Sequence, residues 1–264
     1  MSATTGDDAG SVGLPDTGMP GDHERRRGLH GQVLDRLGMA VCGHELPTDT
    51  VMTIEDIEHR YGVSRSVIRE TVRVLESMGL VSSRRRVGVL VLPPHEWNLF
   101  DPQVIRWRLA SAGRIAQLRS LTELRAAIEP EAARLAAGRS SLANASNLVG
   151  VAGQLWAAGQ AGDVELFLSL DIEFHRLVLV GSGNEMFAKL NNVISEILTG
   201  RTHYGFMPKH PHQEALQSHM DVANAIQRGA PEPAQVAMLA IMDRTMQEMG
   251  HLWDSPHQNA DFFH

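Results

Sequence analysis

Hydrophobic and polar positions follow a helical period through most of this chain, and strand-like runs occur in one region only. From residue 29 onward apolar residues recur every three or four positions, which is the spacing of one buried helix face. Residues 80–83 and 87–92 read instead as two short strands, closed by two prolines. The pattern predicts a mainly α protein, with an N-terminal winged helix-turn-helix, a small β-hairpin wing and a C-terminal all-α helical bundle.

Residues 63–80 form the most informative predicted helix. Ser64 is a typical N-cap residue, apolar side chains recur at helical spacing, and Gly79 ends the segment. The opposite face carries Arg65, Ser66 and Arg69 near the N-terminus, the end that a recognition helix inserts into the major groove. A short helix over 52–61 and a turn at Gly62 precede it, which predicts a helix-turn-helix. Taken alone, an amphipathic helix with a solvated cationic face is the alternative.

The predicted hairpin strengthens the DNA-binding interpretation through its charge. Arg84, Arg85 and Arg86 join its two strands. From residue 63 to 92 six arginines stand against two glutamates, a net charge of +4 in a chain whose total is −7. Positive charge concentrated in this way is what binding to the phosphates of double-stranded DNA requires.

The order of the predicted elements divides the chain into five parts. These are a disordered tail (1–24), a winged helix-turn-helix (25–94), a linker (95–113), an all-helical effector-binding and dimerisation domain (114–250) and a C-terminal tail (251–264). There is no apolar run long enough to span a membrane and no secretory signal, so we expect a cytoplasmic protein with no membrane partner. The single cysteine, Cys42, excludes an internal disulfide and reads as a small core residue.

Arg125 lies in the middle of the apolar stripe of a helix predicted over 115–137. Burying a guanidinium is costly unless an anion meets it. The partner is either an internal carboxylate, Glu129 or Glu123, or the carboxylate of a ligand, and the sequence leaves both open.

Three more polar residues occupy apolar stripes. Asp171 and His175 stand one turn apart on the inward line of a helix over 163–180, a spacing that lets two ligands reach one metal ion. His219 lies on the apolar stripe of a helix over 214–228. Each alone is more often a hydrogen-bonded core residue, but together with Arg125 they predict a shared polar cavity.

The helix-turn-helix resembles the DNA-binding domain of the GntR family of bacterial transcription regulators. The resemblance rests on residues 62–70, residues 74–81 and the wing glycine Gly88. It implies that Arg65, Ser66 and Arg69 contact the operator and that the wing reaches the minor groove near Gly88. Where many members have an arginine early in the second helix, this chain has Glu55, so that contact is expected to be altered and Arg84 to Arg86 to take up part of the phosphate binding.

Residues 115–249 resemble the helical effector domain of the FadR subgroup of this family. In many members an aspartate and three histidines hold a divalent metal, which binds a carboxylate effector together with an arginine. Asp171, His175 and His219 match three of these ligands and Arg125 matches the arginine, whereas the fourth histidine falls at Ile241. The resemblance therefore implies a divalent metal such as zinc with three protein ligands. A cavity that binds the acid by hydrogen bonds alone is the alternative.

The linker pattern from Trp97 to Trp107 is similar to that of family members that respond to sugar acids such as galactonate. Arg201 and His203, expected in a loop between helices, complete the predicted effector contacts with Arg125. The predicted protein is a homodimeric regulator, released from its operator by a small carboxylate, and not an enzyme.

Two other functions remain at this stage. In a metal sensor, the ion alone controls DNA affinity. In a metal-dependent hydrolase fused to a DNA-binding module, Glu173 is the general base. Helical phase argues against the hydrolase, because Glu173 is two residues from both Asp171 and His175 and so points away from them.

Overall fold

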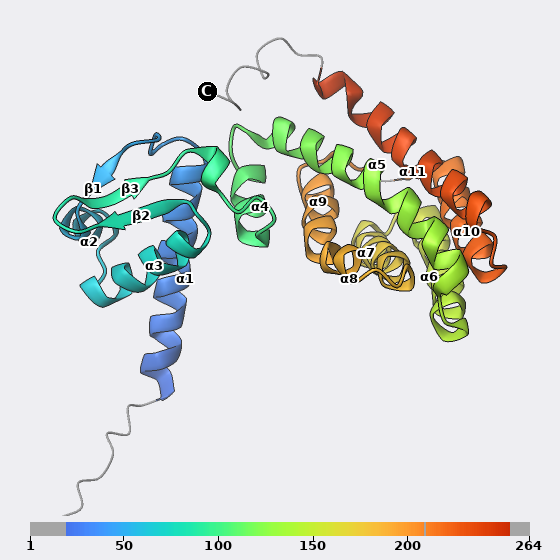
Figure 1. Cartoon of the computed structure of the whole chain (residues 1–264), viewed down its shortest axis with the longest axis horizontal. Coiled ribbons are helices and arrows are strands. Elements are labelled where there is room, and N and C mark those ends of the chain that lie inside the picture. Colours follow the sequence, from blue (N-terminus) through green and yellow to red (C-terminus); the bar gives the residue numbers. More distant parts are fainter. Residues whose placement is uncertain (1–19, 209, 254–264) are drawn as a thin grey trace, which may run out of the picture.

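We describe a computed structural model of the chain, which covers residues 20–208 and 210–253. Figure 1 shows two bodies on either side of a short helix, α4 (Pro102–Leu109). One body holds the helices and the small sheet that precede α4, and the other holds the helices that follow it. The predicted fold class, mainly α with one small sheet, is confirmed.

The first body is the winged helix-turn-helix. Its helix α1 begins at Pro20, so residues 20–24 of the predicted tail are helical, whereas residues 1–19 lie outside the described residues. The elements are α1 (Pro20–Cys42), β1 (Val51–Met52), α2 (Ile54–Tyr61), α3 (Arg65–Ser77), β2 (Val81–Arg84) and β3 (Gly88–Val91), followed by the 3₁₀ turn η1 (Pro94–Glu96).

Local sequence explains the turn between α2 and α3. The Thr53 hydroxyl accepts from the Asp56 backbone N–H at 3.1 Å, and the Asp56 carboxylate accepts from the Thr53 backbone N–H at 2.8 Å, which forms a capping box that starts α2. Gly62 ends α2 with φ of 66°, a left-handed conformation that glycine adopts without steric cost. The chain can therefore enter α3 three residues later, at Arg65.

The wing is part of a three-stranded antiparallel sheet in the order β1-β3-β2. Strand β1 was not predicted, because two residues are too short to show alternation. Strand β1 explains why residue 88 is a glycine. The φ of Gly88 is 128°, and an added Cβ would lie 2.5 Å from the carbonyl oxygen of Met52 in β1. The wing glycine is thus required for the close approach of β1, whatever its position relative to DNA.

The second body is an all-helical bundle. Its elements are α5 (Arg114–Arg139), α6 (Leu142–Ala161), α7 (Val164–Gly181), α8 (Glu185–Lys189), α9 (Asn191–His203), α10 (Gln213–Gln227) and α11 (Pro231–Trp253). The three helices predicted individually here, α5, α7 and α10, agree with the structure to within two residues at each end. Among the described residues, no helix has both the length and the hydrophobicity to cross a bilayer.

Helix α4 is attached to the winged domain through Trp107. The indole N–H of Trp107 donates to the Asp35 carboxylate of α1 at 3.1 Å. Its ring lies so close to Gly38 that an added Cβ would be 2.5 Å from it. Trp107 is 3% exposed and belongs to the core of the winged domain.

The other side of α4 is attached to the helical domain. Arg106 donates to Glu196 of α9 at 2.6 Å, and Leu109 packs on Gly200 of the same helix, where an added Cβ would lie 2.7 Å from Leu109. Helix α4 is therefore held between α1 and α9. Its contacts with these two helices set the position of one domain relative to the other.

Candidate DNA-reading surface and effector site

The first turns of α3 present a basic surface. Ile68, Val72 and Leu75 are buried, and this leaves Arg65, Ser66 and Arg69 exposed on the opposite side of the helix. The first turn of α3 has no acidic residue. The exposed N–H groups of a helix start attract anions, so these arginines surround a position already suited to phosphate.

The wing adds a second basic surface. Arg84, Arg85 and Arg86 are all exposed, and Arg86, at the hairpin tip, has a left-handed φ of 66°. Within the described part of the chain none of these three side chains, nor Arg65 or Arg69, forms an ion pair. Their charges are therefore available to an outside anion.

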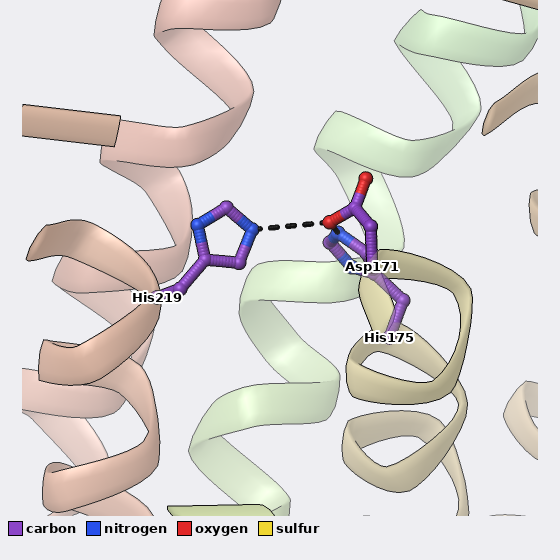
Figure 2. A group of neighbouring side chains, drawn as sticks. All are labelled: Asp171, His175 and His219. Carbon is purple, nitrogen blue, oxygen red and sulfur yellow. Dashed lines mark hydrogen bonds and ion pairs between the residues drawn. The ribbon is translucent and has the colours of Figure 1, made fainter. Parts of the chain in front are cut away.

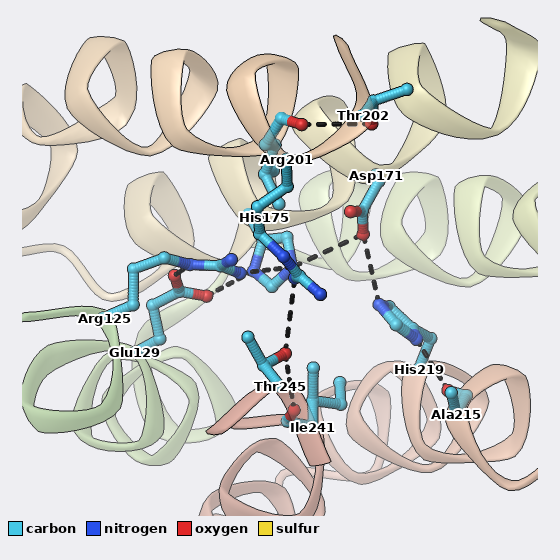
Figure 3. A network of polar contacts seen from close by, with 11 residues as sticks. Arg125, Glu129, Asp171, His175, Arg201, Thr202, Ala215, His219, Ile241 and Thr245 are labelled. Atoms are coloured by element: carbon cyan, nitrogen blue, oxygen red, sulfur yellow. Dashed lines mark hydrogen bonds and ion pairs between the residues drawn. The ribbon is translucent and has the colours of Figure 1, made fainter. Parts of the chain in front are cut away.

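A polar cavity lies inside the helical domain, between α5, α7, α9, α10 and α11. Its volume is about 40 Å³. Figure 3 shows the polar side chains that meet there, from helices far apart in the sequence. The polar lining comprises Arg125, Asp171, His175, Arg201, His219, Arg244, Thr245 and Glu248. The structure thus brings Arg125, Arg201 and the three predicted metal ligands to one cavity.

Asp171, His175 and His219 form the most compact part of the cavity (Figure 2). One ligand atom from each residue lies within 4.8 Å of the other two. Oδ1 of Asp171 is 3.2 Å from Nε2 of His219 and 3.4 Å from Nε2 of His175. All three side chains are buried, so water does not screen their interaction.

The second nitrogen of each imidazole is already engaged. Nδ1 of His219 lies 2.7 Å from the Ala215 carbonyl oxygen, which can only accept, so this nitrogen carries the proton. Nδ1 of His175 is in contact with the Glu129 carboxylate, which requires a proton there in the same way. In neutral rings both Nε2 atoms therefore present lone pairs to an anionic oxygen, an arrangement that calls for a proton or a cation between them.

Arg125 has an internal partner. Its Nε donates to Oε1 of Glu129 at 2.5 Å, and its Nη2 lies 3.1 Å from Nε2 of His175. Glu123 instead accepts from Arg119 at 2.9 Å. Nη1 of Arg125 is buried and has no protein partner. The pair with Glu129 neutralises the guanidinium but leaves one donor for a ligand.

Electrostatics keep the carboxylates of this cavity ionised. Burial by itself raises the pKa of Glu129, but Arg125 and His175 outweigh it and hold that pKa at about 2. Burial likewise opposes ionisation of Asp171, but its close contacts with the two imidazoles bring its pKa well below the ordinary range. Burial disfavours the charged form of His175, but Glu129 raises its pKa overall.

Arg201 is the second buried guanidinium of the cavity. It is 3% exposed, and it reaches Thr245 at 3.4 Å and Glu248 at 3.2 Å, while its Nε has no protein partner. Burial and the charge of Arg125 lower its pKa to about 10. The sequence reading missed Thr245 and Glu248, although they follow Ile241 at i+4 and i+7 on the face of α11 that also lines the cavity.

His203 does not belong to this cavity. The segment expected to be a loop is the last turn of α9, where residues two apart point to opposite sides of the helix. Arg201 therefore faces the cavity, and His203 lines a separate cleft between α1, α4 and α9. The structure thus places the two residues at different cavities, and their predicted contact with one ligand stays a prediction.

Glu173 also lies outside the cavity. Its two carboxylate oxygens accept from Arg176 at 2.6 and 2.7 Å, and it is not among the lining residues. Glu173 therefore does not occupy the position of general base that the hydrolase alternative assigns to it.

A winged helix-turn-helix followed by a helical domain with an internal polar cavity defines a two-domain DNA-binding regulator. Residues 29–91 match the bacterial regulatory proteins of the gntR family, and residues 120–244 match the FCD domain. The chain belongs to the GntR family, in the FadR-like group with an FCD domain, and is a transcription regulator.

Named relatives agree with this assignment. The galactonate operon transcriptional repressor of Escherichia coli (strain K12) is 29% identical over 218 residues, which cover 80% of this chain and 91% of that protein. The HTH-type transcriptional regulator LutR of Bacillus subtilis (strain 168) is 27% identical over 206 residues, or 75% and 90% of the two chains. Lar, which controls the expression of the Listeria monocytogenes agr system, has the same fold with a TM-score of 0.57 at 16% identity, over 85% of this chain and 97% of that one.

Proposed function

We propose that this protein is a homodimeric repressor of an operon for the use of a sugar acid, and that binding of the acid releases it from its operator. The observation that carries the proposal is the convergence of two buried arginines and an Asp-His-His cluster on one cavity. The name of the galactonate operon repressor, similar over 80% of this chain, supports a sugar acid as the class of effector.

The residues fit a divalent metal, with Asp171, His175 and His219 as its ligands. Imidazole nitrogens and a carboxylate oxygen are the donors that zinc takes, and the contacts of both Nδ1 atoms orient the rings as in known zinc sites. An ion held by these three residues would supply a Lewis acid for an oxygen of the effector.

The charge balance of the cavity supports a role for the cation in anion binding. Among the buried groups Arg125 and Arg201 supply two positive charges, and Glu129 and Asp171 supply two negative charges, so with neutral histidines their sum is zero. A neutral cavity gives an anionic acid no net attraction. A divalent cation held by Asp171, His175 and His219 would raise the sum to +2, which favours binding of a carboxylate.

The effector's carboxylate then interacts with the free donors of the two arginines. Nη1 of Arg125 and Nε of Arg201 are buried donors without protein partners, and each such donor costs about 1–3 kcal/mol until an acceptor meets it. A cavity of about 40 Å³ holds roughly three water molecules. A six-carbon acid therefore has to displace part of the wall, which includes Met207, Pro208 and Pro211.

Helix α9 connects this cavity to the DNA-binding domain. Arg201 lies in the cavity, while Glu196 and Gly200 of the same helix hold α4. An effector that pulls on Arg201 and displaces the wall changes the position of α9, and α4 carries that change to α1. Ligands that favour one of two arrangements couple to the other site by their difference in affinity, commonly about 1–3 kcal/mol.

A thermal-shift screen of sugar acids, each with and without a chelator and with added zinc, tests the proposal. We expect one acid to raise the melting temperature only when metal is present, and the same acid to weaken operator binding. Arg125→Ala should bind operator and no longer respond to the acid. Operator binding controlled by zinc alone would identify a metal sensor, and chelator-sensitive turnover of lactones or esters would identify a hydrolase. Light scattering tests the dimer.

A further inference from the structure

Two helices of the effector cavity meet again at the C-terminus of α4. Arg125 and Arg201, the buried arginines of the cavity, belong to α5 and α9. Helix α5 begins at Arg114, and α9 ends at His203, one residue before Tyr204. The guanidinium carbon of Arg114 lies 3.7 Å from the centre of the Tyr204 ring. The helices that carry the two buried arginines are therefore joined at the ends that adjoin α4.

Arg114 is also a partner of the C-terminus of α4. Its Nε donates to the carbonyl oxygen of Leu109, the last residue of α4, at 2.5 Å. The last carbonyl groups of a helix have no partner within the helix, and their partial negative charge favours a nearby cation. Within the described part of the chain Arg114 forms no ion pair. Its charge is therefore met by this carbonyl and by the ring of Tyr204.

The position of Tyr204 depends on Arg201, because α9 ends in a Schellman motif. The backbone N–H of Phe206 donates to the carbonyl oxygen of Arg201 at 2.8 Å. The backbone N–H of Gly205 donates to Thr202 at 3.1 Å, and Gly205 has the left-handed φ of 75° that the motif requires. The residue whose guanidinium lies in the cavity thus also supplies the carbonyl that fixes the turn after α9. Movement of Arg201 toward an occupant of the cavity would move that turn.

The contact between Arg114 and Tyr204 responds to the spacing of α5 and α9. A cation is attracted by the face of an aromatic ring within about 6 Å of its centre, so a displacement of about 2 Å removes most of this contact. The effector cavity is lined by residues of the same two helices. An effector that changes their spacing would therefore weaken the contact and release the end of α4.

We propose that Arg114 and Tyr204 are positioning residues through which the effector cavity controls α4. Their contact holds the end of α4 against α5 and α9, and it weakens when an acid draws Arg125 and Arg201 toward itself. The proposal rests on the proposed function and adds the residues by which effector binding reaches the DNA-binding domain. It concerns the end of α4 and is separate from the ion pair between α4 and α9.

Hydrogen exchange without any effector tests the holding contact. Tyr204→Leu removes the aromatic face and Tyr204→Phe keeps it, whereas Arg114→Lys keeps the charge but loses the planar group and the Nε donor. We expect the α4 amides to exchange about tenfold faster in Tyr204→Leu and in Arg114→Lys, and at the wild-type rate in Tyr204→Phe. Arg119→Lys, beside Glu123 on the same helix, is the matched control. Wild-type exchange in Tyr204→Leu or in Arg114→Lys overturns the proposal.

The response to an acid tests the coupling, with galactonate and zinc as the probe. Two quantities are measured for each variant: the rise in melting temperature, and the ratio of operator dissociation constants with and without the acid. In the wild type we expect a ratio of about ten. Tyr204→Leu should keep the rise in melting temperature but lower the ratio to about three or less. Adding Arg114→Lys should lower the ratio no further, because both substitutions remove the same contact.

The two proposals fail in different ways. If galactonate changes neither the melting temperature nor the operator affinity of the wild type, the proposed function fails for this acid, and the exchange rates decide on Arg114 and Tyr204. If the wild type responds and Tyr204→Leu keeps the full ratio, the effector stands and the link through these residues is overturned. Loss of the rise in melting temperature in Tyr204→Leu also overturns it, because Tyr204 would then act in ligand binding.

Discussion

Nε2 of His219 lies 3.2 Å from Oδ1 of Asp171, although Nδ1 of the same ring is committed to the Ala215 carbonyl. Two acceptors face each other there unless a proton or a metal ion joins them. Nε2 of His175 lies 3.4 Å from the same oxygen and 3.1 Å from Nη2 of Arg125, which can donate to it, so the unmatched acceptors are those of Asp171 and His219. A cation bound by these two residues, with His175 as a third ligand, would satisfy them.

Metal binding should depend on this cluster. We expect the chelated and dialysed protein to take up one zinc ion per chain by calorimetry, and His219→Ala to abolish that uptake. Glu129→Gln, which removes the carboxylate that orients His175, should weaken zinc binding by about 10–100-fold. His203→Ala is the matched control, because His203 lines the separate cleft between α1, α4 and α9. If zinc binding survives His219→Ala unchanged, the metal site is elsewhere.

Arg125 should matter for folding as well as for ligand binding. Arg125→Ala leaves Glu129, 1% exposed, without its cation, and breaking a buried pair in this way costs about 3–5 kcal/mol of unfolding free energy. Arg125→Met with Glu129→Leu removes both charges and should recover most of that loss in urea unfolding. If Arg125→Ala is as stable as the wild type, the pair does not hold these helices together.

Substitutions of the exposed arginines should distinguish base-specific contacts from contacts with the DNA phosphates. Arg69→Ala should weaken operator binding by about 1–3 kcal/mol and reduce discrimination against other sequences. Replacing Arg84, Arg85 and Arg86 by alanine should weaken all DNA binding and lower the slope of log K against log salt by about three. Arg134→Ala, in the helical domain beside Glu131, is the control for added negative charge. A salt slope that stays the same in the triple variant would exclude the wing from phosphate binding.

The contact between Arg106 and Glu196 should carry the effector response rather than stability. The pair is 2.6 Å long, but Arg106 is half exposed, so its contribution to unfolding free energy should stay below about 1 kcal/mol. Glu196→Ala should keep zinc and operator binding and lose part of the change in operator affinity caused by the acid. Exchanging the charges, Arg106→Glu with Glu196→Arg, should restore it. A full response in Glu196→Ala would place the coupling outside this contact.

Cys42 should be unreactive in the folded protein. Burial raises the pKa of its thiol from the ordinary value near 9 to about 12, with Arg108 acting weakly in the other direction. The folded protein thus retains this proton where the unfolded chain loses it, so stability falls as pH rises between about 9 and 12. At pH 8 the thiolate fraction is about 10⁻⁴, and a disulfide reagent should label Cys42 only at the unfolding rate. Rapid labelling of native protein would contradict the buried position.

The sequence predicted the helices well because the helical period of their buried faces is a strong signal, as in α5, α7 and α10. It also placed Asp171, His175 and His219 on inward faces, since a polar residue in an apolar stripe is visible without coordinates. The partner of Arg125 was accessible too: Glu129 is one turn away on the same face, whereas Glu123 is two residues away on another side.

Other features needed the structure. The sequence predicts a loop at the end of α9, in which Arg201 and His203 could contact one ligand. In the structure this segment is helical, so the two side chains point in different directions. Strand β1 exists through its pairing with β3, a contact made far along the chain. Thr245 and Glu248 enter the cavity because α11 packs along α5, and no local pattern specifies which helices become neighbours.

Gly38 and Gly200 have a practical consequence for protein engineering. Each is a notch that accepts one side of α4, Gly38 for Trp107 and Gly200 for Leu109, and a methyl group at either position would push the helix away. A hybrid regulator that joins the DNA reader of one relative to the sensor of another must therefore take α4 together with both notched helices. A fusion joined between α1 and α9 without the matching α4 would give two folded domains in which effector binding no longer changes DNA binding.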